Sequence, residues 1–242
     1  MYFKPAIILL SLAFAVMLFC VFAAPAARAA GLGNGLTEAS LVTGNLTLGY
    51  LLYTPKDTSA QKPLVVYLHG NHSCGSDLKL LKDGGLPAWL SGETHTLDAF
   101  VLCPQCPAGT TWAAIASDVK ALIDEVAKEY AVDVDRISIT GHSLGGAGVW
   151  SMLLNYGDFF YRAAPMSGSV KAQRLDGLPH IPYWIFAGDR DIATTLESCK
   201  AAAAGLKKRG GNVKLTILKG CLHQQVPERA YAKTAVLEWL IQ

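Results

Sequence analysis

The sequence has almost no surplus of charge of either sign. Lysine and arginine together number 21 and aspartate and glutamate 19, which gives a formal net charge of +2 over 242 residues. Two of the cations, Lys4 and Arg28, lie in an apolar N-terminal segment, and the rest of the chain is neutral. A surface that attracts nucleic acid or an anionic membrane is therefore not expected.

Charged residues of any kind are also scarce. They make up 17% of the chain, against 51% hydrophobic residues, and this balance excludes an intrinsically disordered protein. Internal repeats, low-complexity tracts and long linkers are missing as well. The length suits one domain with a sizeable hydrophobic core.

The N-terminal segment has the pattern of a signal peptide. An apolar run over residues 6–24 follows Lys4, Pro25 ends it, and Ala27-Arg28-Ala29 fits the small-x-small cleavage rule. We expect a signal peptide over residues 1–29 and a single domain over 30–242, secreted or periplasmic. Because the run is long enough to span a bilayer, an uncleaved membrane anchor is the alternative.

Cysteine is sparse, and only one Cys-x-x-Cys pair is present, Cys103 and Cys106. A zinc site made by this pair with His72 and Cys74 would have unusual spacing, so no metal is predicted. Export permits disulfides. The candidates are Cys74 with Cys103 or Cys106, and Cys199 with Cys221; free thiols are the alternative reading.

Apolar runs of strand length alternate with segments of helical period. The sequence predicts strands at 46–55, 64–70, 99–104, 136–140, 161–168, 182–188 and 213–220, and helices at 117–130, 145–155, 194–209 and 228–241. Strands joined through helices pair mostly in parallel, and uniformly apolar strands indicate cover on both faces. We therefore expect a three-layer α/β fold with a mostly parallel central sheet and no large lid domain.

The most informative motif is Gly141-His142-Ser143-Leu144-Gly145, a G-x-S-x-G between a predicted strand and a predicted helix. At such a turn the serine oxygen points out over the sheet edge, and glycines avoid clashes with neighbouring elements. The motif arises easily by chance in a chain with 23 glycines. Its position between a strand and a helix favours Ser143 as a nucleophile.

A nucleophilic serine needs a histidine base and an acid that orients the base, and in this architecture they follow in the order serine, acid, histidine. Of the six histidines, His223 alone lies after both Ser143 and the acid candidates. Those candidates are Asp189 and Asp191, at the end of a predicted strand. Asp191 is favoured, because it lies deeper in the loop and can reach His223.

An oxyanion hole and a substrate pocket should accompany these residues. The backbone N–H of Leu144, next to the nucleophile, is one expected oxyanion donor, and Asn71, in the loop after an earlier strand, is the other. Trp112 and His142 are candidates for the substrate pocket, although ordinary core packing is equally plausible for Trp112.

The chain resembles the α/β-hydrolases. The resemblance rests on "YLHG", "CPQCP", "DRISITGHSLGG", "IPYWIFAGDRD" and "HQQ" in this order, and it covers roughly residues 45–242. Among them the chain is similar to small secreted esterases related to feruloyl esterases, polyhydroxybutyrate depolymerases and the "predicted peptidase" or phospholipase/carboxylesterase group. The resemblance implies Ser143 as nucleophile, Asp191 as acid, His223 as base, and Asn71 and Leu144 as oxyanion donors. The loop after Asp191 departs from the Val-Pro usual in these relatives.

These observations predict an exported serine hydrolase that cleaves carboxylic esters through an acyl-enzyme, without a cofactor. Its partner would be a small-molecule or polymer-linked ester, and no nucleic acid or membrane partner is expected after signal cleavage. A serine peptidase with the same triad is one alternative. A non-catalytic binding protein on a hydrolase scaffold is another.

Overall fold

A computed structural model describes residues 35–44, 46–92 and 95–242. The predicted signal peptide, residues 1–29, lies outside these ranges, as does the predicted start of the domain at residue 30. In the part of the chain that the structure describes, no helix is both long and apolar enough to cross a membrane.

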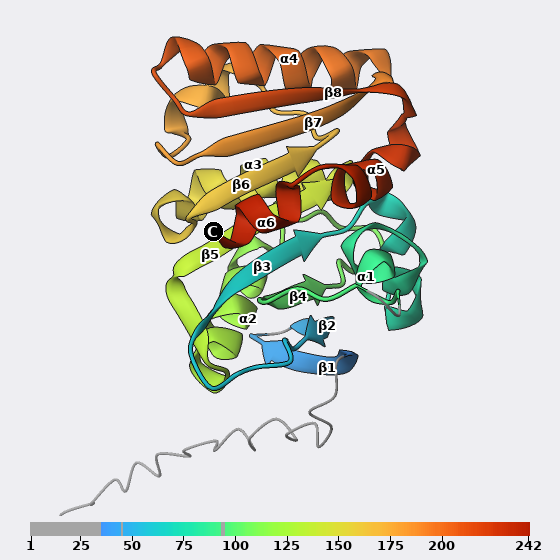
Figure 1. Ribbon diagram of the computed structural model, residues 1–242, viewed down its shortest axis with the longest axis vertical. Coiled ribbons are helices and arrows are strands. Elements are labelled where there is room, and N and C mark those ends of the chain that lie inside the picture. Colours follow the sequence, from blue (N-terminus) through green and yellow to red (C-terminus); the bar gives the residue numbers. More distant parts are fainter. Residues whose placement is uncertain (1–34, 45, 93–94) are drawn as a thin grey trace, which may run out of the picture.

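The core of the protein is an eight-stranded sheet in the order β1-β2-β4-β3-β5-β6-β7-β8 (Figure 1). The strands are β1 (Leu36–Thr43), β2 (Leu46–Tyr53), β3 (Lys62–Leu68), β4 (Phe100–Pro104), β5 (Val132–His142), β6 (Arg162–Met166), β7 (Tyr183–Arg190) and β8 (Val213–Leu222). The pairs β1–β2 and β2–β4 are antiparallel, and every other pair of neighbours is parallel. The prediction of a mostly parallel α/β sheet is confirmed.

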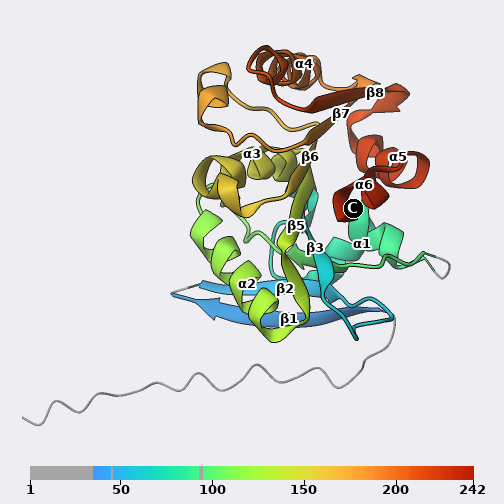
Figure 2. The same ribbon diagram turned by 60° about the vertical axis from the view of Figure 1, so that its left-hand side comes forward.

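Helices cover both faces of this sheet (Figure 2). They are α1 (Gly85–Leu90), α2 (Ala116–Glu129), α3 (Leu144–Tyr156), α4 (Ala193–Lys208), α5 (Val226–Lys233) and α6 (Val236–Ile241). Alternate residues of β3 point to opposite faces. Leu64, Val66 and Leu68 join the core formed with α2, α3 and α4, whereas Val65 and Tyr67 join the core formed with α1, α5 and α6. This arrangement is the predicted three-layer architecture.

The structure differs from the sequence-based expectation at three elements. The predicted helix 228–241 is two helices, because the backbone of Thr234 is extended, with φ −132° and ψ 163°, and so ends α5 before α6 begins. The short helix α1 and the edge strand β1 were not predicted. β1 alternates between exposed and half-buried positions and so lacks a long apolar run.

The parallel strands bring the important loops to one edge of the sheet. The loops after β3, β5, β6, β7 and β8 all leave from the carboxyl ends of neighbouring strands. Ligand sites in open α/β sheets collect at this edge. The longest connection between strands, residues 69–99, starts here and carries two short 3₁₀ helices and α1.

Candidate active site

Ser143 occupies a sharp turn between β5 and α3. Its backbone has φ 57° and ψ −115°, which a residue with a side chain rarely adopts. The Ser143 N–H donates to the Met166 carbonyl at 3.0 Å, and the Ser143 carbonyl accepts from the Ala147 N–H at 2.9 Å. The turn is thus fixed between β6 and the first turn of α3.

The two glycines of the motif allow β5 and α3 to approach the end of β3. A Cβ atom on Gly145 would lie 1.8 Å from the Leu68 carbonyl oxygen, and one on Gly141 would lie 2.6 Å from the same atom. Both distances are too short for any side chain. Glycine is therefore required at both positions for the serine to stand at the sheet edge.

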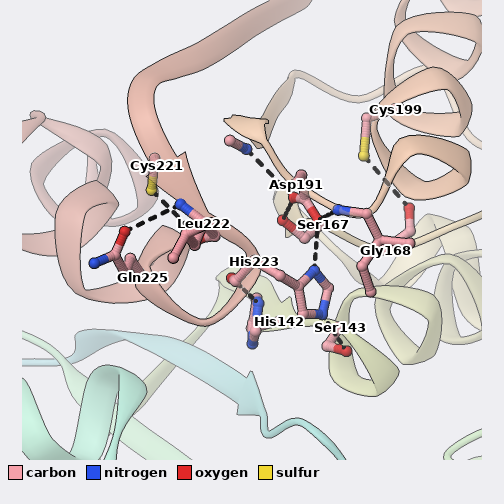
Figure 3. Close-up of polar contacts among 12 residues, drawn as sticks. His142, Ser143, Ser167, Gly168, Asp191, Cys199, Cys221, Leu222, His223 and Gln225 are labelled. Atoms are coloured by element: carbon pink, nitrogen blue, oxygen red, sulfur yellow. Dashed lines mark hydrogen bonds and ion pairs between the residues drawn. The ribbon is translucent and has the colours of Figure 1, made fainter.

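The hydroxyl of Ser143 begins a chain of hydrogen bonds that crosses three loops (Figure 3). Its Oγ lies 2.8 Å from His223 Nε2, and His223 Nδ1 lies 2.6 Å from Asp191 Oδ1. Because an ionised carboxylate can only accept, the proton of the neutral ring belongs on Nδ1, and Nε2 is left to accept the serine proton. This arrangement can activate a serine for nucleophilic attack.

The carboxylate of Asp191 is buried and surrounded by donors. Its side chain is 0% exposed, and Ser167 Oγ, the Gly188 N–H and the Ile192 N–H all donate to it. Burial alone raises the pKa of Asp191, but the hydrogen bonds from Ser167, His223 and Gly188 outweigh burial, so the pKa lies below its ordinary value. Asp191 is therefore ionised at neutral pH and can orient His223.

The other acid candidate, Asp189, has a different environment. Its Oδ1 accepts the Cys221 N–H at 3.1 Å, and the residue is exposed. Backbone hydrogen bonds, first of all from Gly220, lower the pKa of its carboxyl. Asp189 thus ties β7 to β8, while Asp191 is the carboxylate that contacts His223.

Ser167 contacts the site and was missed by the sequence analysis, which placed it at the end of a strand over 161–168. It lies immediately after β6, is 2% exposed, and donates to Asp191 Oδ2 at 2.5 Å. A polar residue at the carboxyl end of a parallel strand, followed by glycine, was the available signal. That signal does not say which residue the hydroxyl contacts.

His142 lies between the nucleophile turn and the His223 loop. Its Nε2 donates to the His223 carbonyl oxygen at 2.8 Å, and the two rings are 4.8 Å apart. Burial, and next the nearby His223, lower the pKa of His142 to about 4, so its ring is neutral at pH 7. His142 also lines a cavity of about 180 Å³ together with Gly70, His72 and Gln224. The structure thus places this pocket candidate at a cavity next to Ser143 and in contact with His223.

The loop after β3 also passes close to Ser143. A Cβ atom on Gly70 would lie 3.6 Å from the Ser143 Cβ, so the backbone that leads into Asn71 passes beside Ser143. Asn71 opens a 3₁₀ turn and Leu144 opens α3. Because the first N–H groups of a helix lack an intrahelical partner, both N–H groups suit an oxyanion.

His69 holds this loop in place through hydrogen bonds at both of its ring nitrogens. Its Nδ1 lies 2.6 Å from the Gly70 carbonyl oxygen, and its Nε2 accepts the Cys106 N–H at 2.9 Å. Trp112, 1% exposed, donates from its indole to the His69 carbonyl at 3.1 Å and packs edge-on against the His69 ring. Trp112 therefore lies in the core beneath the loop, away from open surface.

The cysteines of the described residues are all free thiols: Cys74, Cys103, Cys106, Cys199 and Cys221. None of the disulfides considered from the sequence is present among them. Cys74 and Cys106 contact each other through their side chains, whereas Cys103 packs in the core on the opposite face of the sheet from Cys106. Within the described ranges, no three His, Cys, Asp or Glu side chains gather as metal ligands would.

Two comparisons of sequence bear on this site. The model of the prolyl oligopeptidase family matches residues 112–185, a segment that contains Ser143 and ends before Asp191 and His223. The chain is also similar to poly(3-hydroxyalkanoate) depolymerase C from Paucimonas lemoignei, with 29% identity in an alignment of 140 positions that covers 52% of this chain and 32% of that protein. An "uncharacterized secreted protein" of Arthroderma benhamiae is 28% identical in an alignment of 149 positions that covers 53% of this chain and 14% of that one. The chain thus spans a third or less of the length of these relatives.

Solved structures share the fold. A thermostable esterase superimposes with a TM-score of 0.76 and 26% sequence identity, over 85% of this chain and 62% of the esterase. Est1E from Butyrivibrio proteoclasticus gives a TM-score of 0.62 at 17% identity, over 84% of this chain and 95% of its own. The second likeness concerns the fold alone.

Proposed function

The chain resembles the esterases of the α/β-hydrolase fold, and we propose that it is an exported serine hydrolase that cleaves carboxylic esters. Ser143 is the proposed nucleophile, His223 the base and Asp191 the acid that orients it. The hydrogen-bonded chain from Ser143 Oγ through His223 to Asp191 Oδ1, with distances of 2.8 Å and 2.6 Å, is the observation that supports this proposal most directly.

The proposed reaction proceeds through an acyl-enzyme. Ser143 Oγ attacks the ester carbonyl carbon while His223 Nε2 takes the hydroxyl proton. The tetrahedral intermediate collapses, the carbon–oxygen bond to the alcohol breaks, and His223 returns the proton to the departing oxygen. Water then attacks the acyl carbon with His223 again as base. The bond to Ser143 Oγ breaks as His223 returns the proton to that oxygen, and the carboxylic acid leaves. Asp191 stabilises the imidazolium and fixes the ring.

The negative oxygen of the intermediate would be held by the backbone N–H groups of Asn71 and Leu144. The Leu144 N–H lies at the N-terminus of α3, where the helix dipole adds positive potential. Each oxyanion donor is typically worth about a hundredfold to a thousandfold in rate. The cavity beside His142 is the proposed binding place for one side of the ester.

The direct test is hydrolysis of short and medium p-nitrophenyl esters and of methyl ferulate by the wild-type protein and by Ser143→Ala. We expect turnover by the wild type and loss of about 10⁴-fold or more in the variant, because no other group replaces the nucleophile. A serine-directed fluorophosphonate should label the wild type and leave the variant unlabelled.

The melting temperature of Ser143→Ala serves as the control for folding. If the variant folds and hydrolyses the esters as fast as the wild type, Ser143 is not the nucleophile. A folded wild type that neither turns over any of these esters nor reacts with the fluorophosphonate would support the alternative of a non-catalytic scaffold.

A serine peptidase is the second candidate, because the prolyl oligopeptidase model matches the segment around Ser143. The same triad can cleave an amide if His223 protonates the departing nitrogen. Matched p-nitrophenyl ester and p-nitroanilide substrates with the same acyl group separate the two proposals. Because any such triad cleaves the more reactive ester, efficient turnover of the anilide as well would favour the peptidase, and turnover of the ester alone would favour the esterase.

Two further parts of the proposal concern location and substrate. Export is supported by the N-terminal pattern of residues 1–29 and by the relative described as a secreted protein. An ester in a polymer is one proposed substrate, as suggested by the resemblance to a poly(3-hydroxyalkanoate) depolymerase. No cofactor, nucleic-acid partner or membrane partner is part of the proposal, which treats residues 30–242 as one domain.

A further inference from the structure

Ser167 has a backbone conformation that few residues with a side chain adopt. Among the described residues, the two non-glycine residues with positive φ are Ser143, at 57°, and Ser167, at 48°. Glycine adopts this region without a steric penalty, and other residues keep it only where the surroundings hold them. The first of the two is the proposed nucleophile, and the second lies directly after the neighbouring strand β6.

The turn that contains Ser167 is fixed by packing against the nucleophile helix. The Ser167 N–H donates to the Phe186 carbonyl at 2.8 Å. A Cβ atom on the next residue, Gly168, would lie 2.2 Å from the Gly146 carbonyl carbon, and the Trp150 indole donates to the Gly168 carbonyl at 3.0 Å. A glycine at position 167 would relieve the backbone, so the presence of serine points to a use for its hydroxyl.

That hydroxyl contacts the triad acid. Ser167 Oγ donates to Asp191 Oδ2 at 2.5 Å, in a place where the serine is 2% exposed and the Asp191 side chain is 0% exposed (Figure 3). The other carboxylate oxygen, Oδ1, accepts from His223 Nδ1 at 2.6 Å. The Gly188 N–H also donates to Oδ2, at the longer distance of 3.3 Å, so the Ser167 hydroxyl is the closer of the two donors to this oxygen. Hydrogen bonds to an ionised group are strong, and the Ser167 bond therefore resists rotation of the carboxylate.

We propose that Ser167 is a positioning residue: its hydroxyl fixes the Asp191 carboxylate in the orientation that receives the His223 Nδ1–H. The proposal rests on the proposed serine hydrolase function for its kinetic consequences. Ser167 would then be a fourth member of the hydrogen-bonded chain that already contains Ser143, His223 and Asp191. The strained backbone of Ser167 is the structural cost of placing this hydroxyl.

Two variants separate the hydroxyl from the backbone. Ser167→Ala and Ser167→Gly both remove the hydrogen bond, and Ser167→Gly also removes the strain. With p-nitrophenyl acetate we expect both to lose about tenfold or more in kcat, with KM changed by less than about twofold. Without this donor the buried carboxylate becomes more basic and holds the His223 proton more tightly, so the acid limb of kcat/KM should move to higher pH.

A merely structural role gives a different result. Ser167→Gly would then keep the kcat and the pH profile of the wild type, and the proposal would be overturned. The matched control is Ser138→Ala, which removes a fully buried hydroxyl that donates to the Leu240 carbonyl at 2.7 Å. This control should lower the melting temperature and leave kcat and the acid limb unchanged.

A measurement without substrate separates this inference from the proposed function. The His223 Nδ1–H, held against Asp191, should give a low-field proton NMR resonance that shifts or broadens in Ser167→Gly and stays in place in Ser138→Ala. An unchanged resonance in Ser167→Gly overturns the positioning role. If the wild type cleaves neither esters nor amides, the proposed function fails, while a shifted resonance still supports the coupling from Ser167 to His223.

Discussion

Acid should destabilise this protein through His69, a histidine that is buried in its neutral form. The His69 ring is 2% exposed, and its Nε2 accepts the Cys106 N–H, so a proton on Nε2 would face another donor. Burial lowers the pKa of His69 to about 4, while the hydrogen bond to the Gly70 carbonyl acts weakly in the opposite direction. Protonation of this ring is therefore disfavoured in the folded protein.

The sign and size of the effect follow from the two pKa values. In the unfolded chain His69 takes up its proton near pH 6.5, whereas in the folded protein it stays neutral until the pH reaches about 4. The unfolded state thus binds more protons between these values, and the stability present above pH 6.5 is lost as the pH falls towards 4. The loss at pH 4 amounts to roughly 3 kcal/mol.

Urea unfolding of the wild type and of His69→Gln at several pH values between 4 and 7.5 measures this contribution. Glutamine can accept the Cys106 N–H but does not titrate, and His142 titrates in the same window in both proteins. The difference in the free energy of unfolding between the two proteins should shrink by roughly 3 kcal/mol from pH 7.5 to pH 4. A difference that stays constant refutes the reasoning.

Three further results are expected. Asp191→Asn should lower kcat in the ester assay by about 10⁴-fold, because His223 loses the carboxylate that orients it. Asp189→Asn should keep a kcat within about tenfold of the wild type, and equal losses in the two variants would contradict the choice of Asp191 as the acid. Gly145→Ala should reduce the free energy of unfolding in urea by more than about 3 kcal/mol, since the new Cβ would lie 1.8 Å from the Leu68 carbonyl oxygen. A variant as stable as the wild type would show that the turn at Ser143 can open to admit a side chain. A thiol reagent should modify Cys74 first under native conditions, because the other described cysteines are buried. Peptide mapping measures the order of modification, and a result in which Cys103 or Cys106 reacts first would contradict their burial.

Much of the fold was predictable from local patterns. Uniformly apolar strands alternating with helical segments fix a parallel sheet with two covered faces, because each strand must return through a crossover. The elements that escaped prediction are short or half-exposed, such as β1 and α1, and their apolar patterns are too weak to read. The break at Thr234 also escaped, because the extended backbone of this one residue has no clear sequence signal.

The sequence by itself also determined the serine turn and the order of the candidate triad. The two glycines around Ser143 have no side chains, and the chain order of acid and histidine left His223 as the one remaining base. These conclusions depend on neighbours in sequence and on the order of strands. Such information is contained in the chain before it folds.

Tertiary structure alone decided the finer roles. It brought Asp191 to His223 and Asp189 to the Cys221 backbone, and it directed the Ser167 hydroxyl at Asp191 from the end of a different strand. It also buried the His69 ring between a carbonyl oxygen and an N–H from the next loop. The physical reason is that the direction of a side chain and its loss of solvent depend on residues far away in sequence, which come together only when the sheet has formed.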